Sequence, residues 1–137
     1  MSAASDYMEN KVLDHVLMNT AYTQPTALYL GLFTNASGSA DANLEQGVLS
    51  DEVATGGTAY GRESINFDAA SGGSAQNGTT VTFPAATANW GTVTHVAVLD
   101  AASGGNVLFY GAVTTPKTIE AGDTFQVTAG NFTISLA

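Results

Sequence analysis

The chain has 137 residues, and 45% of them are hydrophobic, so it is long enough for one domain with a buried core and too apolar to be disordered throughout. The chain has twelve acidic and three basic residues, for a net charge of −9. This charge excludes direct nucleic-acid binding and disfavours adhesion to an anionic membrane. The chain has no cysteine, so disulfides and thiolate metal sites are excluded as well.

The amino-terminal residues predict a helix. No basic stretch leads into an apolar one, so we expect no signal peptide, and no run approaches the ~20 apolar residues of a membrane span. Asp6 and Glu9 have the spacing of a capping box, and the pattern predicts a helix over residues 6–19 that ends before Pro25. Its apolar positions are Met8, Val12 and Val16, with Leu13 and Leu17 beside them.

That apolar face has two interpretations, because a helix of this length is marginal in isolation. It either covers one end of the remaining domain or packs on a neighbouring subunit. We therefore divide the chain into an amino-terminal helix arm, residues 1–26, and a β domain, residues 27–137.

Short strands separated by turns follow the helix. The first, residues 27–34, is apolar on both faces, and residues 60–67 alternate as a strand does. Between them, residues 35–57 form a long irregular loop, of the kind that is usually functional or mobile. The remaining predicted strands are residues 80–83, 93–100, 106–113, 124–128 and 131–136.

The sequence Asp-Ala-Ala-Ser-Gly-Gly occurs twice, at residues 68–73 and 100–105. Aspartate can hydrogen-bond the backbone two residues on, and the paired glycines supply positive φ, so each copy predicts a hairpin connection. Strands without intervening helices favour antiparallel pairing. We therefore predict an all-β fold, an antiparallel two-sheet sandwich, jelly-roll-like, with one N-terminal α-helix. An immunoglobulin-like sandwich is the second topology.

Residues capable of catalysis do not form a recognisable motif. His15 lies on the predicted helix and His95 in a predicted strand, on a row that faces solvent, and we interpret both as structural. Paired carboxylates occur at Asp51-Glu52 and at Asp41 and Glu45, in a loop that offers no apolar wall of the kind catalytic carboxylate pairs need. We predict that the chain is not an enzyme and holds no cofactor.

Two residue groups have alternative interpretations. The loop carboxylates could bind calcium, but their spacing does not match an EF-hand, and we predict no metal. Trp90, which precedes a strand, is either a plug that closes one end of the sandwich or a platform on which a sugar stacks.

Several segments resemble a family of small proteins from tailed bacteriophages. Members are described as tail-fibre-like proteins or as capsid decoration (cement) proteins, the latter being jelly rolls bound outside the head shell. The resemblance covers nearly the whole chain except residues 35–57, and it implies no catalytic residues. The segments that carry it are Asp6-Tyr7, Glu9-Asn10, Tyr29–Thr34, Tyr60–Arg62, Val81–His95, Asp100–Ala102, Gly104–Leu108, Gly111–Lys117 and Gly122-Asp123.

The resemblance implies a non-enzymatic virion structural protein, made in the host cytoplasm. Because the chain is short and shows no shaft segment, we expect a capsid decoration protein on the capsid exterior, which binds the phage major capsid protein lattice and stabilises it by its binding free energy. The alternative is a tail fibre or tail-tip protein that binds host surface glycans. We expect a homo-oligomer, a dimer or trimer, with no nucleic-acid or membrane partner. The expected partner contacts lie on the helix arm and the long loop: Tyr7, Met8, Val12, Tyr22, Asp51 and Glu52.

Overall fold

A computed structural model describes residues 2–136. The helices are α1 (Asp6–Leu17) and α2 (Ala40–Glu45). The strands are β1 (Ser2–Ala4), β2 (Tyr29–Phe33), β3 (Glu63–Ser64), β4 (Ser74–Gln76), β5 (Val81–Thr82), β6 (Gly91–Leu99), β7 (Val107–Ile119), β8 (Gln126–Val127) and β9 (Thr133–Ser135).

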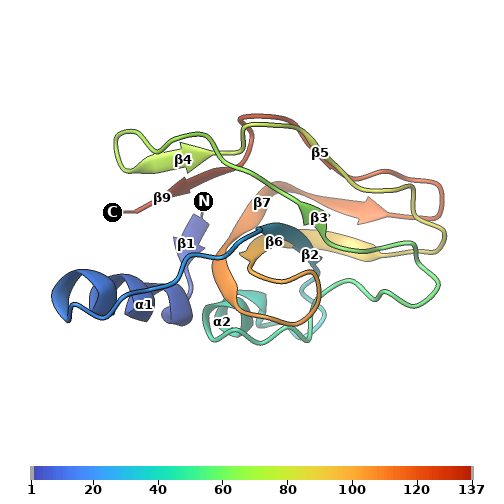
Figure 1. The fold of residues 1–137 in the computed structure, drawn as a ribbon. Coiled ribbons are helices and arrows are strands. Elements are labelled where there is room, and N and C mark those ends of the chain that lie inside the picture. Colours follow the sequence, from blue (N-terminus) through green and yellow to red (C-terminus); the bar gives the residue numbers. More distant parts are fainter. Residues whose placement is uncertain (1, 137) are drawn as a thin grey trace.

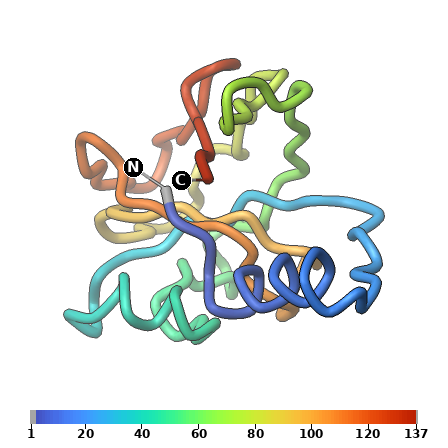
Figure 2. The backbone as a smooth tube through the Cα atoms, turned by 90° about the vertical axis from the view of Figure 1, so that its left-hand side faces the viewer, coloured from blue at the N-terminus to red at the C-terminus, as the bar shows by residue number. Residues whose placement is uncertain are grey.

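The centre of the fold is a five-stranded sheet in the order β1-β7-β6-β2-β3. The two-stranded ribbons β4–β9 and β5–β8 lie over one face of this sheet, and α2 lies against the other (Figure 1). All the strand pairs are antiparallel. The backbone view shows that α1 runs along one side of the molecule and that β1 and β9 are neighbours (Figure 2).

The long hairpin β6–β7 is built around the second copy of the repeated turn. The Asp100 carboxylate accepts hydrogen bonds from the backbone N–H of Asn106, at 2.7 Å, and from its side-chain amide, at 3.0 Å. Gly105 has φ of +73°, and a Cβ there would lie 2.6 Å from the Asp100 Oδ1. The turn therefore needs this glycine, and the hairpin predicted from it is confirmed.

Three apolar clusters hold the layers together. The largest lies between the sheet and the ribbons, where Leu30, Leu32, Val96 and Val98 meet Phe83, Phe125, Phe132 and Ile134. The second joins α2 to the opposite face through Leu44, Phe33, Ala97, Leu99 and Val107. The third places Met8 of α1 on Ala4 and Leu108. Because strand side chains alternate, β6 supplies the first two clusters from successive residues.

The all-β, sandwich-like fold with an N-terminal helix is confirmed. Its upper layer consists of two separate ribbons. Of the predicted strand at residues 60–67 only β3 is a strand, and Tyr60 lies in the core, where it is 5% exposed. Three elements fall outside the predicted ranges, and one of them, β4, lies just after the first copy of the repeated turn. β1 pairs with β7 at the sheet edge, and α2 gives the 35–57 loop an ordered, partly buried segment through Ala40 and Leu44.

The cap of α1 also differs from the prediction. Ser5, one residue before Asp6, is the N-cap, and its Oγ accepts the Met8 backbone N–H at 3.3 Å. The same hydroxyl donates to the Val107 carbonyl oxygen on β7. Ser5 therefore starts the helix and fixes it to the sheet at once. No helix within residues 2–136 has the length and apolar character needed to cross a membrane.

Candidate interaction surface

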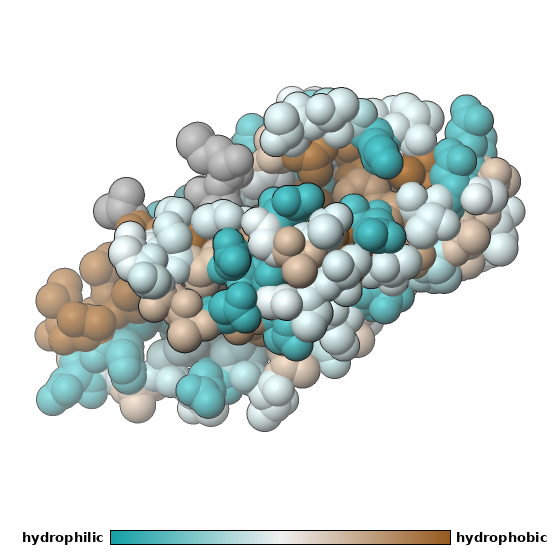
Figure 3. Space-filling model, turned by 90° about the horizontal axis from the view of Figure 1, so that it is seen from above, coloured by the Kyte–Doolittle hydropathy of each residue, from teal (hydrophilic) through white to brown (hydrophobic). Residues whose placement is uncertain are grey.

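Only the first half of α1 packs on its own domain. Met8 is 7% exposed, and Tyr7 and Val12 are half-buried beside it. The far end of the helix projects from the molecule as an apolar lobe (Figure 3). Its side chains, which we call the α1 tip, are 53 to 73% exposed: Leu13, Val16, Leu17 and Met18.

The structure brings four of the six predicted contact residues together. Tyr7, Met8, Val12 and Tyr22 all belong to the cluster that anchors α1 to β7. The helix was given two interpretations: it covers its own domain, or it packs on a neighbouring subunit. The first applies to these four residues, whereas the α1 tip remains open for a partner. His15 contributes to this anchorage, because its Nδ1 accepts the Tyr22 backbone N–H at 3.1 Å.

The other two predicted residues lie apart from α1, in the loop, and both make contacts inside the chain. Asp51 is 5% exposed, and its carboxylate accepts the backbone N–H of Ser37 at 3.1 Å and the Ser37 hydroxyl at 2.6 Å. These bonds close the segment that leads into α2. Asp51 thus stabilises the 35–57 loop through hydrogen bonds to Ser37.

Glu52 is paired with Arg62 in the most heavily bonded ionic contact of the described residues. Arg62 Nε and Nη2 each donate to the Glu52 carboxylate at 2.7 Å, and the Arg62 side chain is only 2% exposed. Its Nη1 donates to the carbonyl oxygens of Ala101 and Gly104, at 2.7 and 2.8 Å. One guanidinium therefore ties the 35–57 loop to the repeated turn between β6 and β7.

Tyr60 completes this contact. Its hydroxyl donates to the Glu52 carboxylate at 2.7 Å and accepts the Leu32 backbone N–H at 3.0 Å. Burial, and after it the charge of Glu52, raises the pKa of Tyr60 well above its usual range. Burial opposes the charge on Arg62, but hydrogen bonding and attraction to Glu52 outweigh it, so that the pKa of Arg62 is also raised. The raised pKa values keep the Arg62 guanidinium charged and the Tyr60 phenol neutral.

A second set of contacts fixes α2 to the sheet. His95 is buried, against the prediction of a solvent-facing row, because it shares the α2 face of β6 with Ala97. Its Nε2 lies 2.9 Å from Asp41 and its Nδ1 lies 2.8 Å from the Thr94 hydroxyl. Tyr110 donates to Glu45, and burial followed by that bond raises the pKa of Tyr110 above its usual range.

The Thr94, His95 and Asp41 contacts have the order of a nucleophile, base and orienting acid. However, neither Thr94 nor His95 lines any of the three cavities described along residues 2–136. The hydroxyl and the ring come from adjacent residues of one strand, and the carboxylate comes from α2. The arrangement therefore joins α2 to β6.

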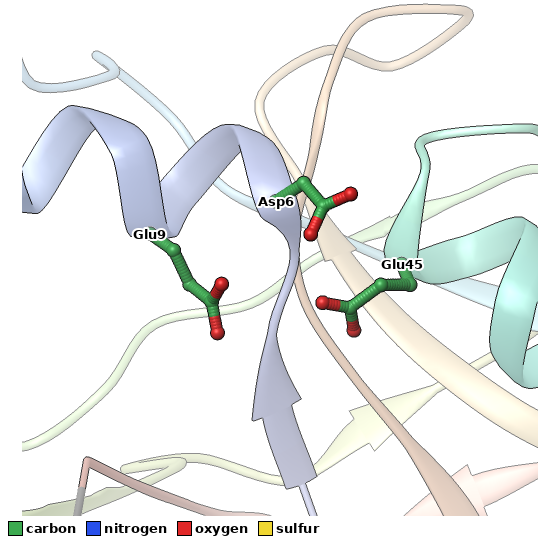
Figure 4. A group of neighbouring side chains, drawn as sticks. All are labelled: Asp6, Glu9 and Glu45. Atoms are coloured by element: carbon green, nitrogen blue, oxygen red, sulfur yellow. The ribbon is translucent and has the colours of Figure 1, made fainter.

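Three carboxylates converge where α1 begins beside α2. Asp6, Glu9 and Glu45 have oxygens within 4.8 Å of one another (Figure 4). Oxygen donors of this kind suit a hard cation such as Ca²⁺, which takes about six to eight of them. The amino end of a helix also favours negative charge without any ion. Of the four loop carboxylates, only Glu45 belongs to this cluster; Asp41, Asp51 and Glu52 contact His95, Ser37 and Arg62 in turn. The expectation of no metal stays a prediction.

The Trp90 side chain points into the core. Trp90 is 5% exposed, and its Nε1 donates to the Thr58 carbonyl oxygen at 2.8 Å. Its ring makes edge contacts with Tyr60 and Phe83. Of the two alternatives, Trp90 is therefore a plug that closes one end of the sandwich, and its ring face is not available to stack on a sugar.

Two cavities open between the sheet and the ribbons. The larger, of about 590 Å³, lies between β7 and the β8–β9 segment and has a mixed lining that includes Thr114, Lys117 and Asn131. The smaller, of about 260 Å³, lies under the β4–β9 ribbon and is lined almost entirely by apolar atoms. We call the smaller one the β4–β9 groove. Its walls include Leu28, Phe67, Ala75, Phe109, Ile134 and Leu136.

The comparison with protein families matches residues 3–135 to the model described as Podophage GP4 fiber I protein gp80. The chain belongs to this family. The match supports a phage structural protein with a role in the virion, and it does not specify capsid decoration. A search of the curated proteins found no match.

Two features of this surface are not predicted from the sequence. Arg62 is one of three basic residues among twelve acidic ones, which indicates that a carboxylate partner is available to it but not which carboxylate that is. The sequence predicts the apolar helix face from Met8, Val12 and Val16, with Leu13 and Leu17 beside them, but it does not separate the α1 tip from the buried part of that face. The exposure of the tip could not be read from the period of the helix, because that depends on where the sheet ends.

Proposed function

We propose that this chain is a non-enzymatic structural subunit of a phage fibre, and that it works by attaching to other virion proteins. The observation that carries the proposal is the family match over residues 3–135, which includes nearly every described element. The exposed α1 tip supplies the geometry that attachment needs. Contiguous exposed apolar side chains on a soluble protein mark contact sites more often than chance.

The absence of enzymatic activity is supported by how the ionisable side chains are used. Glu52 and Arg62 neutralise each other under the loop, and His95 bonds to groups of its own domain on both ring nitrogens. A general base must reach a substrate proton within hydrogen-bonding distance. These groups instead hold the loop and α2 to the sheet, which is a role in rigidity.

The family description favours a fibre over the outer capsid surface, because it names a fibre protein. The second candidate, binding of host surface glycans through stacked aromatic rings, draws less support. Trp90 is buried, and each Phe and Tyr of the chain is buried or half-buried. Attachment to protein is the better fit to these surfaces.

The composition suits a docked protein. Only 11% of residues are charged, so few long side chains lose rotamer freedom, at up to ~2 kcal/mol each, when a partner covers them. The net charge of −9 keeps the free subunit soluble and steers it towards partners with a basic rim.

Imaging of labelled virions tests the proposal. A short epitope tag is inserted between Gly56 and Gly57, where both residues are exposed and a Cβ would meet no atom within 4 Å. Gold-conjugated antibody should then decorate fibres, and untagged virions give the background. Gold spread over the head surface, or virions without label although the tagged chain is expressed, would overturn the fibre assignment.

A further inference from the structure

The sequence holds one Asn-Gly pair, Asn77-Gly78, which lies between β4 and β5. In such a pair the backbone nitrogen after the asparagine can attack the side-chain amide readily, because glycine has no Cβ to hinder the approach. A bond forms between the Gly78 nitrogen and Asn77 Cγ, the Cγ–Nδ2 bond breaks, and the Gly78 proton leaves with the NH₂ group as ammonia. Water then opens the cyclic imide to aspartate or to its β-linked isomer.

The native fold holds the side chain of Asn77 in hydrogen bonds. The residue is 0% exposed. Its Oδ1 accepts the backbone N–H of Phe132 at 2.9 Å. Its Nδ2 donates to the carbonyl oxygens of Thr79 and Thr128, at 2.9 and 3.2 Å. These three bonds fix the plane of the amide and keep water away from Cγ.

The attacking nitrogen is held as well. The Gly78 N–H donates to the carbonyl oxygen of Asn66 at 3.1 Å. A Cβ at position 78 would lie only 2.5 Å from Asp68 Oδ1, so the packing requires glycine there. Packing therefore selects the residue that makes the pair reactive, and the same packing keeps the pair from reacting.

Asn77 belongs to the part of the fold with the shortest strand pairings. The β4–β9 ribbon has three residue pairs and the β5–β8 ribbon has two, and neither ribbon pairs with the five-stranded sheet. A two-stranded ribbon is marginal by itself, and native proteins open locally at such places. Thr128 and Phe132 lie between β8 and β9. Separation of the ribbons therefore frees the Asn77 side chain while the five-stranded sheet stays formed.

A carboxylate at position 77 does not fit the native layer. An ionised aspartate has no donor, so the bonds to the Thr79 and Thr128 carbonyl oxygens are lost, and a negative charge faces both oxygens at a site with 0% exposure. An unpaired buried charge is among the most destabilising changes that a fold can receive. The β-linked isomer also lengthens the backbone by one atom, which displaces the hydrogen bonds on either side.

We propose that Asn77 is a deamidation site that the native fold protects and that is exposed when the ribbons open, so that a chain which has opened is converted to a form that cannot close again. This modification goes beyond the proposed fibre role and does not depend on it, because it acts on the single chain. Copies that stay folded keep the amide, whereas copies that open lose it and can no longer form the native surface.

The first test compares deamidation of the folded and the unfolded chain. The full chain is incubated in mildly alkaline buffer with and without denaturing urea, and fragment-ion mass spectrometry locates each exchange of NH₂ for OH. In urea, Asn77 should react faster than Asn106, which precedes valine. Without urea, the reaction at Asn77 should be slower on the order of a hundredfold or more, because its rate follows the small population of open molecules.

The second test links the reaction to the ribbons. Ile134→Ala shortens a buried side chain of β9 and should speed deamidation in buffer about tenfold or more, because it loosens the ribbon. Leu13→Ala is the matched control, since it removes the same number of carbon atoms from a 53% exposed position of α1, and it should leave the rate unchanged.

The third test makes the product directly. Asn77→Asp should unfold at a clearly lower urea concentration than the wild type, as followed by Trp90 fluorescence. The proposal would be overturned by equal rates with and without urea, by an Asn77 no faster than Asn106 in urea, or by an Asn77→Asp chain as stable as the wild type. Equal rates in folded Ile134→Ala and Leu13→Ala would also overturn it. The wild-type rates and the Asn77→Asp stability decide the matter even where Ile134→Ala does not fold.

Discussion

Replacing Glu52 by alanine should destabilise the fold more than any exposed change. The substitution leaves the Arg62 guanidinium, 2% exposed, without its carboxylate, while Ala101 and Gly104 still accept from Nη1. Breaking one side of a buried ion pair costs about 3–5 kcal/mol. A domain is stable by about 5–15 kcal/mol in all, so Glu52→Ala should remove a large share of the total. Tyr60 also loses its acceptor.

A double-mutant cycle separates the buried charge from the remaining contacts. Glu52→Gln with Arg62→Met removes both charges, and it should cost less than the sum of the single changes by about 1–3 kcal/mol. Glu120→Ala, an exposed carboxylate in a turn, serves as the control and should stay within about 0.5 kcal/mol.

The free energy of unfolding can be measured by urea titration with Trp90 fluorescence, since Trp90 is the single tryptophan and is 5% exposed. A loss below about 1 kcal/mol for Glu52→Ala would show that the pair behaves as a surface salt bridge. That result would refute the claim that Arg62 and Glu52 hold the loop to the β6–β7 turn.

Three further changes probe other parts of the fold. The free energy of unfolding should fall above pH ~10, by up to about 1.4 kcal/mol per pH unit, because the unfolded chain releases the Tyr60 proton there while burial keeps it on the native phenol. Urea titrations at each pH should show a shallower decline for Tyr60→Phe. An unchanged slope would contradict this. Gly31→Ala places a Cβ 3.0 Å from Leu99 Cδ1 and should lower the stability measured by thermal unfolding by about 1–3 kcal/mol. The control Gly56→Ala, whose Cβ meets nothing within 4 Å, should leave the stability almost unchanged. Equal losses would argue against the close packing of β2 on β6. Ser5→Ala removes the N-cap of α1 and should cost about 1 kcal/mol or more, with faster amide exchange in the first turn; unchanged exchange would show that the cap is dispensable.

The sequence predicts best where local chemistry decides the structure. The β6–β7 hairpin follows from Asp100 and the glycines of its turn, and α1 follows from apolar residues at helical spacing. β1 could not be predicted in this way. Ser2–Ala4 consists of three small residues without an apolar–polar alternation, and it forms a strand because it pairs with the edge of β7. α2 is likewise set by burial of Leu44.

The candidate surface was predicted in part, for a related reason. The apolar helix face was identified, but Tyr7, Met8, Val12 and Tyr22 bind their own domain, and which residues remain free depends on the length of the sheet beneath. Asp51 and Glu52 are predicted as partner contacts in the long loop, but contacts within the chain bury Asp51 and pair Glu52 with Arg62. Proximity of Arg62 in space is not visible in the order of residues.

Electron microscopy of phage particles assembled without this chain tests its central role most directly. If the chain is a fibre subunit, these particles should have full, stable heads and missing or shortened fibres, and supplying the wild-type chain should restore the fibres. Particles with intact fibres and heads that lose their DNA under mild stress would contradict it, because that result is the signature of a lost capsid clamp.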